Sequence, residues 1–428
     1  MRITVCLCSG IRDVTVRRWN KVWLCRGRFY DPPPRVPKAL AEKGINIVEV
    51  NKITPKLENW IAPVDDPRFA EPVLPQNQPD WKSNPAFTHS SNIRLYEGVK
   101  QACLIANAQH FEGFPATVEK LIGAVDIPEK TLMLQRSIMQ SQVWNTDEAR
   151  LPKPFDASKP RYHYKPQYGI TRMKSTQILL RNLLRLSNSV IAEYPSLRNR
   201  KQVTDLHLHT HLNYKGNPII MKEDLDLLVT SDQMLPPFAG KDVMDASFQY
   251  TVPDMWPIHP TVDFMETNNY ELTNHTGFKT EDMYTCPHTI VQFPRKFHWE
   301  EKHYKAAQIM SCLMYTSALA RRKYGDDVKV LPEPISIQHV LMDHDHFLFT
   351  FFQLNTLDLD LSTGVKNFVW TAEKAQLFKK IKGQSWSLEE SLQHDRLEDF
   401  EPSAFDKFMA AYLYGVSDVS MKKEAAEE

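Results

Sequence analysis

Three histidines on one predicted strand have the spacing that most resembles a metal site. His207, His209 and His211 alternate with leucine and threonine. Residues two apart on a strand share a face about 6.6 Å apart, so these imidazoles and Asp205 could share Zn²⁺ or Fe²⁺. One strand cannot close a coordination shell, and no HExxH or CxxC motif completes it. We therefore favour a half-buried strand with its polar side in water, keep a metal-dependent hydrolase or nuclease as the alternative, and assign no metal ligand or cofactor.

A second acid–histidine cluster runs from Asp343 to His346, between two strand-like runs. Polar residues in that place are typical of a hairpin turn, and no second motif is spaced to complete a catalytic site. The phosphate-binding patterns GxGxxG and GxxxxGK are absent, as is the nucleophile pattern GxSxG. We therefore interpret the cluster as a turn and assign no catalytic residue.

Basic residues gather between positions 161 and 201, where nine bases accompany a single acid, Glu193. Lys174, Arg181 and Arg185 follow steps of seven and four, which places them on one helix face opposite the leucines. A positive stripe beside tyrosines suits phosphate contact and base stacking, although a solvated helix face is the simpler alternative. The candidate RNA-contacting residues are Arg161, Tyr162, Tyr164, Lys165, Tyr168, Arg172, Lys174, Arg181, Arg185, Arg198, Arg200 and Lys201.

The elements that position these groups follow from hydrophobic periodicity. We expect helices at 132–144, 175–194, 300–324 and 402–415, a helix capped by Ser90 or Ser91, and another starting at Pro115. We expect strands at 203–214, 225–230, 261–265, 289–293, 335–342 and 346–354. Helices first, then strands with helices interposed, predict an α+β fold with a mixed helical and β-sheet globular body.

The two ends of the chain differ from this body in composition. Residues 1–30 hold seven bases and one acid, which is typical of a mitochondrial presequence, with an ordered basic arm as the alternative. Residues 31–90 carry eleven prolines and predict an extended arm. The body then spans 91–416, and 417–428 form a charged tail.

Bulk composition narrows the possible function classes. The 428 residues carry 52 bases and 52 acids, and this zero net charge argues against a generic nucleic-acid binder. No run of 18 apolar residues occurs, so no membrane span is expected. Residues 387–428 hold eleven acids and four bases and should face solvent or protein.

Several long blocks resemble the animal mitochondrial large ribosomal subunit protein 37 family. They lie at 94–116, 141–153, 194–201, 257–279, 286–291, 330–340, 349–371 and 401–416, in the order that the family has. The resemblance implies a structural constituent of the mitochondrial large ribosomal subunit, located in the matrix and not an enzyme.

The same resemblance implies a set of partners. They are the large-subunit rRNA and neighbouring mitochondrial ribosomal proteins, including a sister protein of the programmed cell death protein 9 family. The histidine run at 207–211 is not a feature that we associate with the family. A mitochondrial RNA-binding factor outside the ribosome remains an alternative.

Overall fold

The computed structural model describes residues 37–44, 81–143, 149–150, 168–279, 282–294, 299–359, 364–381 and 397–416. The chain divides into two compact units, Met1–Val73 and Leu74–Glu428. The described part of the first unit is a short helix, α2 (Lys38–Ala41). The predicted presequence, most of the predicted arm and the tail at 417–428 lie outside the described residues.

A ten-stranded mixed sheet forms the centre of the second unit, with the order β2-β11-β10-β9-β8-β6-β1-β7. In addition, β5 pairs with β6, and β12 pairs with β10. Parallel pairing joins β1 to β6, β8 to β9 and β11 to β2, whereas the other pairs are antiparallel. The strands are β1 (Trp81–Ser90), β2 (Ala108–Glu112), β5 (Lys201–Tyr214), β6 (Asn217–Ser231), β7 (Met265–Asn269), β8 (Cys286–Gln292), β9 (Val330–Asp343), β10 (His346–Thr356), β11 (Asn367–Thr371) and β12 (Ala375–Gln376).

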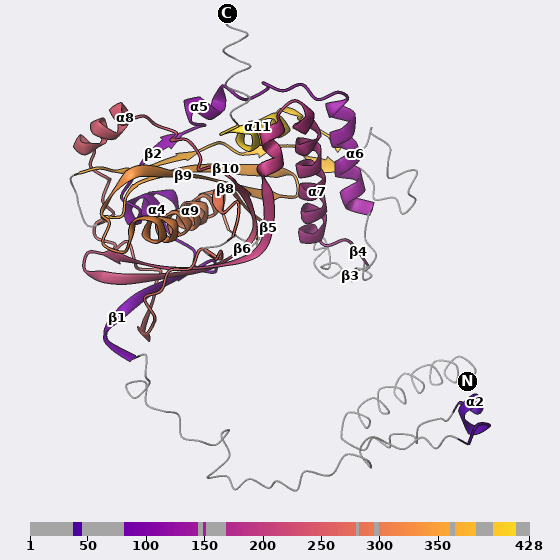
Figure 1. The fold of residues 1–428 in the computed structure, drawn as a ribbon, viewed down its shortest axis with the longest axis horizontal. Coiled ribbons are helices and arrows are strands. Elements are labelled where there is room, and N and C mark those ends of the chain that lie inside the picture. Colours follow the sequence, from indigo (N-terminus) through magenta and orange to yellow (C-terminus); the bar gives the residue numbers. More distant parts are fainter. Residues whose placement is uncertain are drawn as a thin grey trace, which may run out of the picture. The chain divides into compact units, whose positions relative to one another are not determined.

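Helices cover both faces of this sheet, which confirms the predicted α+β class. Figure 1 shows α4 and α9 between β9–β10 on one side and β5–β6 on the other, so the sheet curves around them. The helices α5, α6, α7 and α11 pack on the opposite face. Their bounds are α4 (Val99–Ile105), α5 (Ala116–Glu119), α6 (Lys130–Val143), α7 (Arg172–Ser187), α8 (Lys241–Ala246), α9 (Glu301–Tyr324) and α11 (Ser403–Leu413). Within the described ranges, none of the helices combines the length and the apolar character of a membrane span.

Both faces of β10 are buried, each in a different hydrophobic core. Phe349 and Phe351 belong to the core beneath α7 and α11, whereas Phe352 and Leu354 belong to the core around α9. A strand covered on both faces needs apolar residues at consecutive positions, and this explains the apolar run Phe347–Phe352 of the sequence. Two short ladders, β3 (Ala149–Arg150) with β4 (Tyr168–Gly169) and β13 (Lys380–Ile381) with β14 (Leu397–Glu398), lie apart from the main sheet.

The central helix α9 begins and ends where its sequence signals predict. Glu300 and His303 form a reciprocal capping box at the N-terminus, which satisfies backbone donors of the first turn. Bases fill the last turn, and Gly325 follows with a φ of 91°. The helix dipole favours cations at this end, and glycine adopts a positive φ without strain. The predicted helix at 300–324 is therefore confirmed to within one residue.

Other expectations about single elements were wrong in their bounds. The helix expected to start at Ser90 begins only at Val99, because β1 continues through Ser90 in parallel register with β6. Residues 81–90 of the predicted arm are thus part of the sheet, and their register breaks around Pro85, which has no N–H to donate. The strand expected at 261–265 starts at Met265. The short strands β2 and β11 were missed.

Candidate nucleic-acid interface and histidine strand

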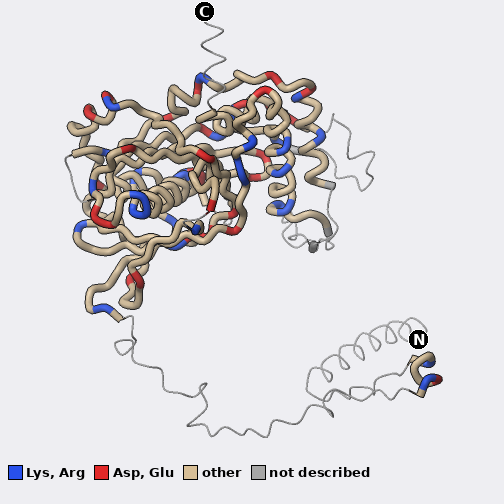
Figure 2. The backbone as a smooth tube through the Cα atoms, in the orientation of Figure 1, with Lys and Arg blue, Asp and Glu red and all other residues tan. Residues whose placement is uncertain are grey.

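Helix α7 carries the centre of the basic segment, residues 172–201. Thr171 caps the helix by accepting the Lys174 N–H at 3.4 Å. The leucine face, with Leu179 and Leu183, is buried against the sheet. On the other side Arg181 and Arg185 are exposed, as their spacing predicts, and Lys174 is half-buried. Figure 2 shows the bases distributed along this helix. The helix therefore presents positive charge to its surroundings through one face.

Arg172, at the start of α7, is exposed and is bound to a neighbouring turn of the fold. Its Nε and Nη2 donate to the two oxygens of Asp343 at 2.7 Å each, and Nη2 lies 3.4 Å from Asp345. A bidentate pair of this kind has both specific geometry and charge-assisted hydrogen bonds. The guanidinium thus joins α7 to the turn between β9 and β10, and its charge is balanced by two carboxylates.

The Arg200 side chain also binds to other residues of the fold. Its guanidinium lies 4.8 Å from the Tyr412 ring centroid and donates to the Tyr414 carbonyl at 2.9 Å. Burial lowers the pKa of Arg200 to about 10. His288 also lies 2.9 Å from the same carbonyl oxygen through Nε2. The segment between the 3₁₀ turn Pro195–Asn199 and β5 turns Arg200 inward, so its expected contact with RNA does not fit its position.

The rest of the candidate set divides into exposed bases and residues outside the described part. Arg198 and Lys201 are exposed, and the Lys201 ammonium lies 4.3 Å from the Tyr284 ring centroid. Only the backbone of Tyr168 is described, as part of β4. The expected contacts of Arg161, Tyr162, Tyr164 and Lys165 fall outside the described residues.

The three histidines of β5 have three different sets of partners. His207 is exposed, and its Nδ1 lies 2.6 Å from Asp224. His209 is buried and donates from Nδ1 to the Thr273 carbonyl at 2.9 Å. The side chain of His211 lies against the Arg321 guanidinium. These separate partners favour a structural strand, but the expectation of a polar side in water was wrong for His209.

A loop on the outer edge of β5 explains the burial of His209. The backbones of His209 and His275 exchange two hydrogen bonds, of 3.2 and 2.7 Å, so the loop adds a single bridge to the strand. Desolvation by this cover lowers the pKa of His209. Asp205, the expected carboxylate partner, is exposed and has a φ of 55°, which takes it out of the strand's alternation.

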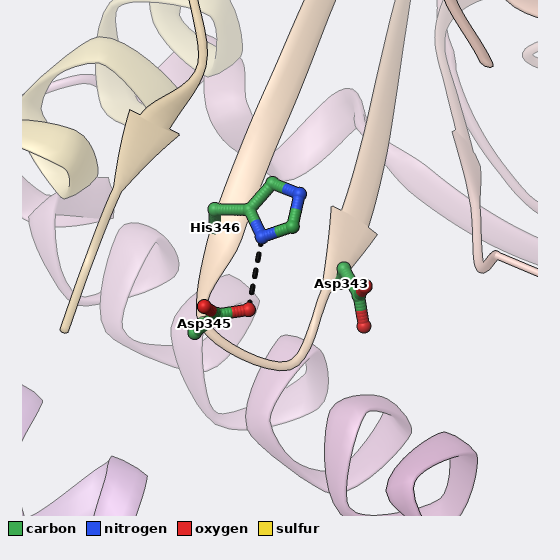
Figure 3. A group of neighbouring side chains, drawn as sticks. All are labelled: Asp343, Asp345 and His346. Carbon is green, nitrogen blue, oxygen red and sulfur yellow. Dashed lines mark hydrogen bonds and ion pairs between the residues drawn. The ribbon is translucent and has the colours of Figure 1, made fainter. Parts of the chain in front are cut away.

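The turn between β9 and β10 contains the one group of three potential metal ligands that the described residues bring together. Asp343, Asp345 and His346 form this group, and Figure 3 shows His346 bonded to Asp345 with Asp343 across the turn. Burial acts to raise the pKa of Asp345, but the 2.9 Å bond to His346 and the charge of Arg172 help to hold it below its usual value. The strand register pairs Asp343 with His346, which confirms the predicted hairpin turn. The cluster thus fastens a hairpin to α7.

A buried polar chain between α9 and the sheet was missed by sequence reasoning. Gln308 Nε2 donates to the Leu348 carbonyl and to His339 Nδ1, both at 3.0 Å. His339 Nε2 lies 2.9 Å from Gln292 Oε1, and the Gln292 amide donates to Glu223 at 2.8 Å. Burial lowers the pKa of His339 to about 3, so its imidazole is neutral. The sequence signal that could have indicated this chain is the presence of polar residues inside otherwise apolar elements.

Most of the chain is similar in sequence to vertebrate proteins that share one name. No protein-family model matches the chain. The chain is 30% identical to the large ribosomal subunit protein mL37 of Rattus norvegicus over 372 residues, which cover 83% of this chain and 80% of the relative. The protein of the same name from Bos taurus is 28% identical over 421 residues, or 93% of each chain. The protein from Gallus gallus is 26% identical over 423 residues, or 92% of this chain and 91% of the relative.

Proposed function

The chain belongs to the family of the large ribosomal subunit protein mL37, and from this membership we propose that it is a structural constituent of the mitochondrial large ribosomal subunit. It acts in the mitochondrial matrix and supports mitochondrial translation as a scaffold. The observation that carries this proposal is sequence similarity over most of both chains, including 93% of each chain in the comparison with Bos taurus.

The geometry supports a scaffold more than a catalyst. The histidines of β5 face separate partners, and the acid–histidine turn has an arginine bound to both of its aspartates. An active site instead needs nucleophile, base and substrate position within mutual reach. Polar side chains in the described part of β5 and the β9–β10 turn are used to join elements to one another.

Contact with rRNA is proposed for the remaining described bases of the basic segment, which are exposed apart from the half-buried Lys174. Arg172 and Arg200 bind other parts of the fold, so the proposed contacts come from the other bases on α7 and after it. Exposed guanidinium and ammonium groups bind phosphate without reading sequence, which suits a protein that positions rRNA. The proposed rRNA-contacting residues are Lys174, Arg181, Arg185, Arg198 and Lys201.

Two finer parts of the proposal concern the ends and the neighbours of the chain. Residues 1–30 direct the chain into mitochondria, because a basic, acid-poor segment suits import. A sister protein of the programmed cell death protein 9 family is a neighbour in the particle.

Sedimentation tests the main proposal directly. The full-length chain is expressed in cultured animal cells, and a mitochondrial lysate is separated on a sucrose gradient with magnesium present. We expect the chain to migrate with the large subunit and to shift to lighter fractions when the rRNA is digested. A chain that remains at the top of the gradient with free proteins contradicts a ribosomal role.

A further inference from the structure

A loop at residues 254–264, together with Met265 at the start of β7, turns large apolar side chains outward. Trp256 is 86% exposed, Ile258 43%, Val262 59% and Met265 72%. Four large apolar side chains exposed within ten residues of one short segment are unusual, and such exposed apolar groups mark a surface that another molecule covers. The four residues Trp256, Ile258, Val262 and Met265 are called the apolar loop surface below.

Residues of the loop that face inward hold it against the body. Met255 and Phe264 are buried, and the Phe264 ring packs edge-on against His89 at a centroid distance of 5.3 Å. The buried amide of Gln101, on α4, donates to the Pro260 carbonyl at 2.6 Å and to Asp263 at 3.0 Å. Each end of the loop is therefore fastened to the body, and the outward side chains need no movement of the loop to meet a partner.

The surroundings of the loop have a negative charge bias. Residues 242–278 contain six acids and no lysine or arginine. Asp254 and Glu266, at the ends of the loop, are exposed, whereas Asp263 also accepts the Tyr96 N–H at 3.0 Å. Several bases lie beside this segment: the Arg94 guanidinium is 5.9 Å from the Tyr96 ring centroid, the Lys82 ammonium is 4.4 Å from the Tyr270 ring centroid, and Arg322 donates to Thr276 and to the Phe278 carbonyl. The exposed carboxylates of Asp254 and Glu266 lie next in sequence to the outward apolar side chains and repel phosphate there, so the apolar loop surface suits a protein more than rRNA.

We propose that the apolar loop surface docks another protein of the large subunit, through a segment that carries lysine or arginine beside apolar side chains. Tryptophan and methionine are enriched in the centres of protein interfaces, and a buried tryptophan commonly supplies much of the binding energy. Bases on the partner meet the acids at the rim and set its orientation. This inference rests on the proposed function, and it gives the chain two surfaces of opposite character: bases around α7 for rRNA and this loop for protein.

Site-specific photo-crosslinking in the assembled particle tests the inference. The full-length chain is made with Trp256→p-benzoylphenylalanine, large subunits are purified on a gradient, and the crosslinked product is identified by mass spectrometry. Met283, which is 77% exposed outside the loop, supplies the matched control with the same replacement. We expect position 256 to crosslink to a ribosomal protein, in a peptide with lysine or arginine, at a yield about tenfold above position 283, because an interface core is fully covered.

The outcomes separate this inference from the proposed function. A crosslink from position 256 to rRNA overturns the inference, and so do equal yields at the two positions in sedimenting particles. If the 256 variant alone fails to enter the particle while its circular dichroism matches the wild type, the loop is required for assembly and the inference stands. If the wild-type chain does not sediment with the large subunit, the proposed function fails, and the inference fails with it.

Discussion

The guanidinium of Arg172 lies side-on against the carboxylate of Asp343, with Nε and Nη2 each 2.7 Å from a different oxygen. These residues are 171 positions apart in the sequence, and their pairing joins α7 to the hairpin between β9 and β10. The same pairing removes one base from the segment that we propose for rRNA. Basic side chains on α7 therefore have two uses: Arg172, although exposed, pairs with Asp343 and stabilises the fold, whereas Arg181 and Arg185 are proposed to contact rRNA.

Replacement of Arg172 should lower stability more than replacement of an exposed base on the same helix. We expect Arg172→Ala to reduce the free energy of unfolding by about 1 kcal/mol, because the variant cannot form the bidentate pair with Asp343. Arg172→Lys should restore less than half of this stability, since lysine cannot bind both oxygens side-on. Urea denaturation of the full-length chain measures both, with Arg185→Ala as the control. Equal stabilities of the two alanine variants contradict the structural role of Arg172.

Binding to rRNA should depend on the exposed bases and not on the engaged one. We expect Arg181→Gln with Arg185→Gln to weaken binding to large-subunit rRNA fragments at low salt and to lower the salt dependence by about one unit for each phosphate that the variant no longer neutralises. Filter binding over a range of potassium chloride concentrations measures the slope. Arg172→Gln removes the same type of charge and serves as the control. If its slope falls as much as that of the double variant, the assignment of the interface is wrong.

Gly277 should be far less tolerant of a side chain than Gly216, although the two have similar backbone angles. Their φ values are 80° and 82°, so alanine is strained at both. A Cβ on Gly277 would also lie 2.3 Å from Cδ1 of Leu206, which is buried, whereas nothing lies within 4 Å at Gly216.

We expect Gly216→Ala to cost about 1 kcal/mol of stability and Gly277→Ala about 1 to 3 kcal/mol more. Urea denaturation provides the comparison. The Gly277→Ala, Leu206→Ala double variant should recover part of the difference by removing the clash, and no recovery would argue against this packing.

Mild acid should destabilise the protein through its buried histidines. Burial lowers the pKa of His339 to about 3 and that of His89 to about 4, from 6.5 in the unfolded chain. Between the folded and the unfolded pKa values, the unfolded state binds more protons than the folded state. These histidines therefore leave the free energy of unfolding unchanged above pH 6.5 and lower it as the pH falls toward about 3. At pH 5 each of the two histidines should lower the free energy of unfolding by about 2 kcal/mol, since one pKa unit corresponds to about 1.4 kcal/mol.

The His339→Gln variant tests this dependence, because glutamine keeps a polar side chain but does not titrate. Urea denaturation at pH 7 and pH 5 should show that the stability of the variant falls by about 2 kcal/mol less than that of the wild type over this interval. The difference between the two pH values is the quantity compared, since the substitution also alters the hydrogen bonds to Gln308 and Gln292. Identical decreases in both proteins would exclude His339 as a source of the acid sensitivity.

Sequence by itself was sufficient for features whose signals lie within a few residues. The ends of α9 follow from its capping box and Gly325, the hairpin at 343–346 follows from its polar turn, and the exposure of Arg181 and Arg185 follows from helical spacing. Each of these depends on backbone geometry that neighbouring residues determine. The α+β class follows in the same way from the order of such local patterns.

Tertiary structure decided which similar residues are used inside the fold and which remain outside. Arg198 and Arg200 are two positions apart, but only Arg200 packs on Tyr412, which lies more than 200 residues away in the chain. His209 is buried because the loop at Thr273–His275 covers it, and β1 joins the sheet because β6 and β7 lie beside it. Hydrogen bonding and desolvation depend on neighbours that the folded chain brings together, and no local pattern in the sequence specifies those neighbours.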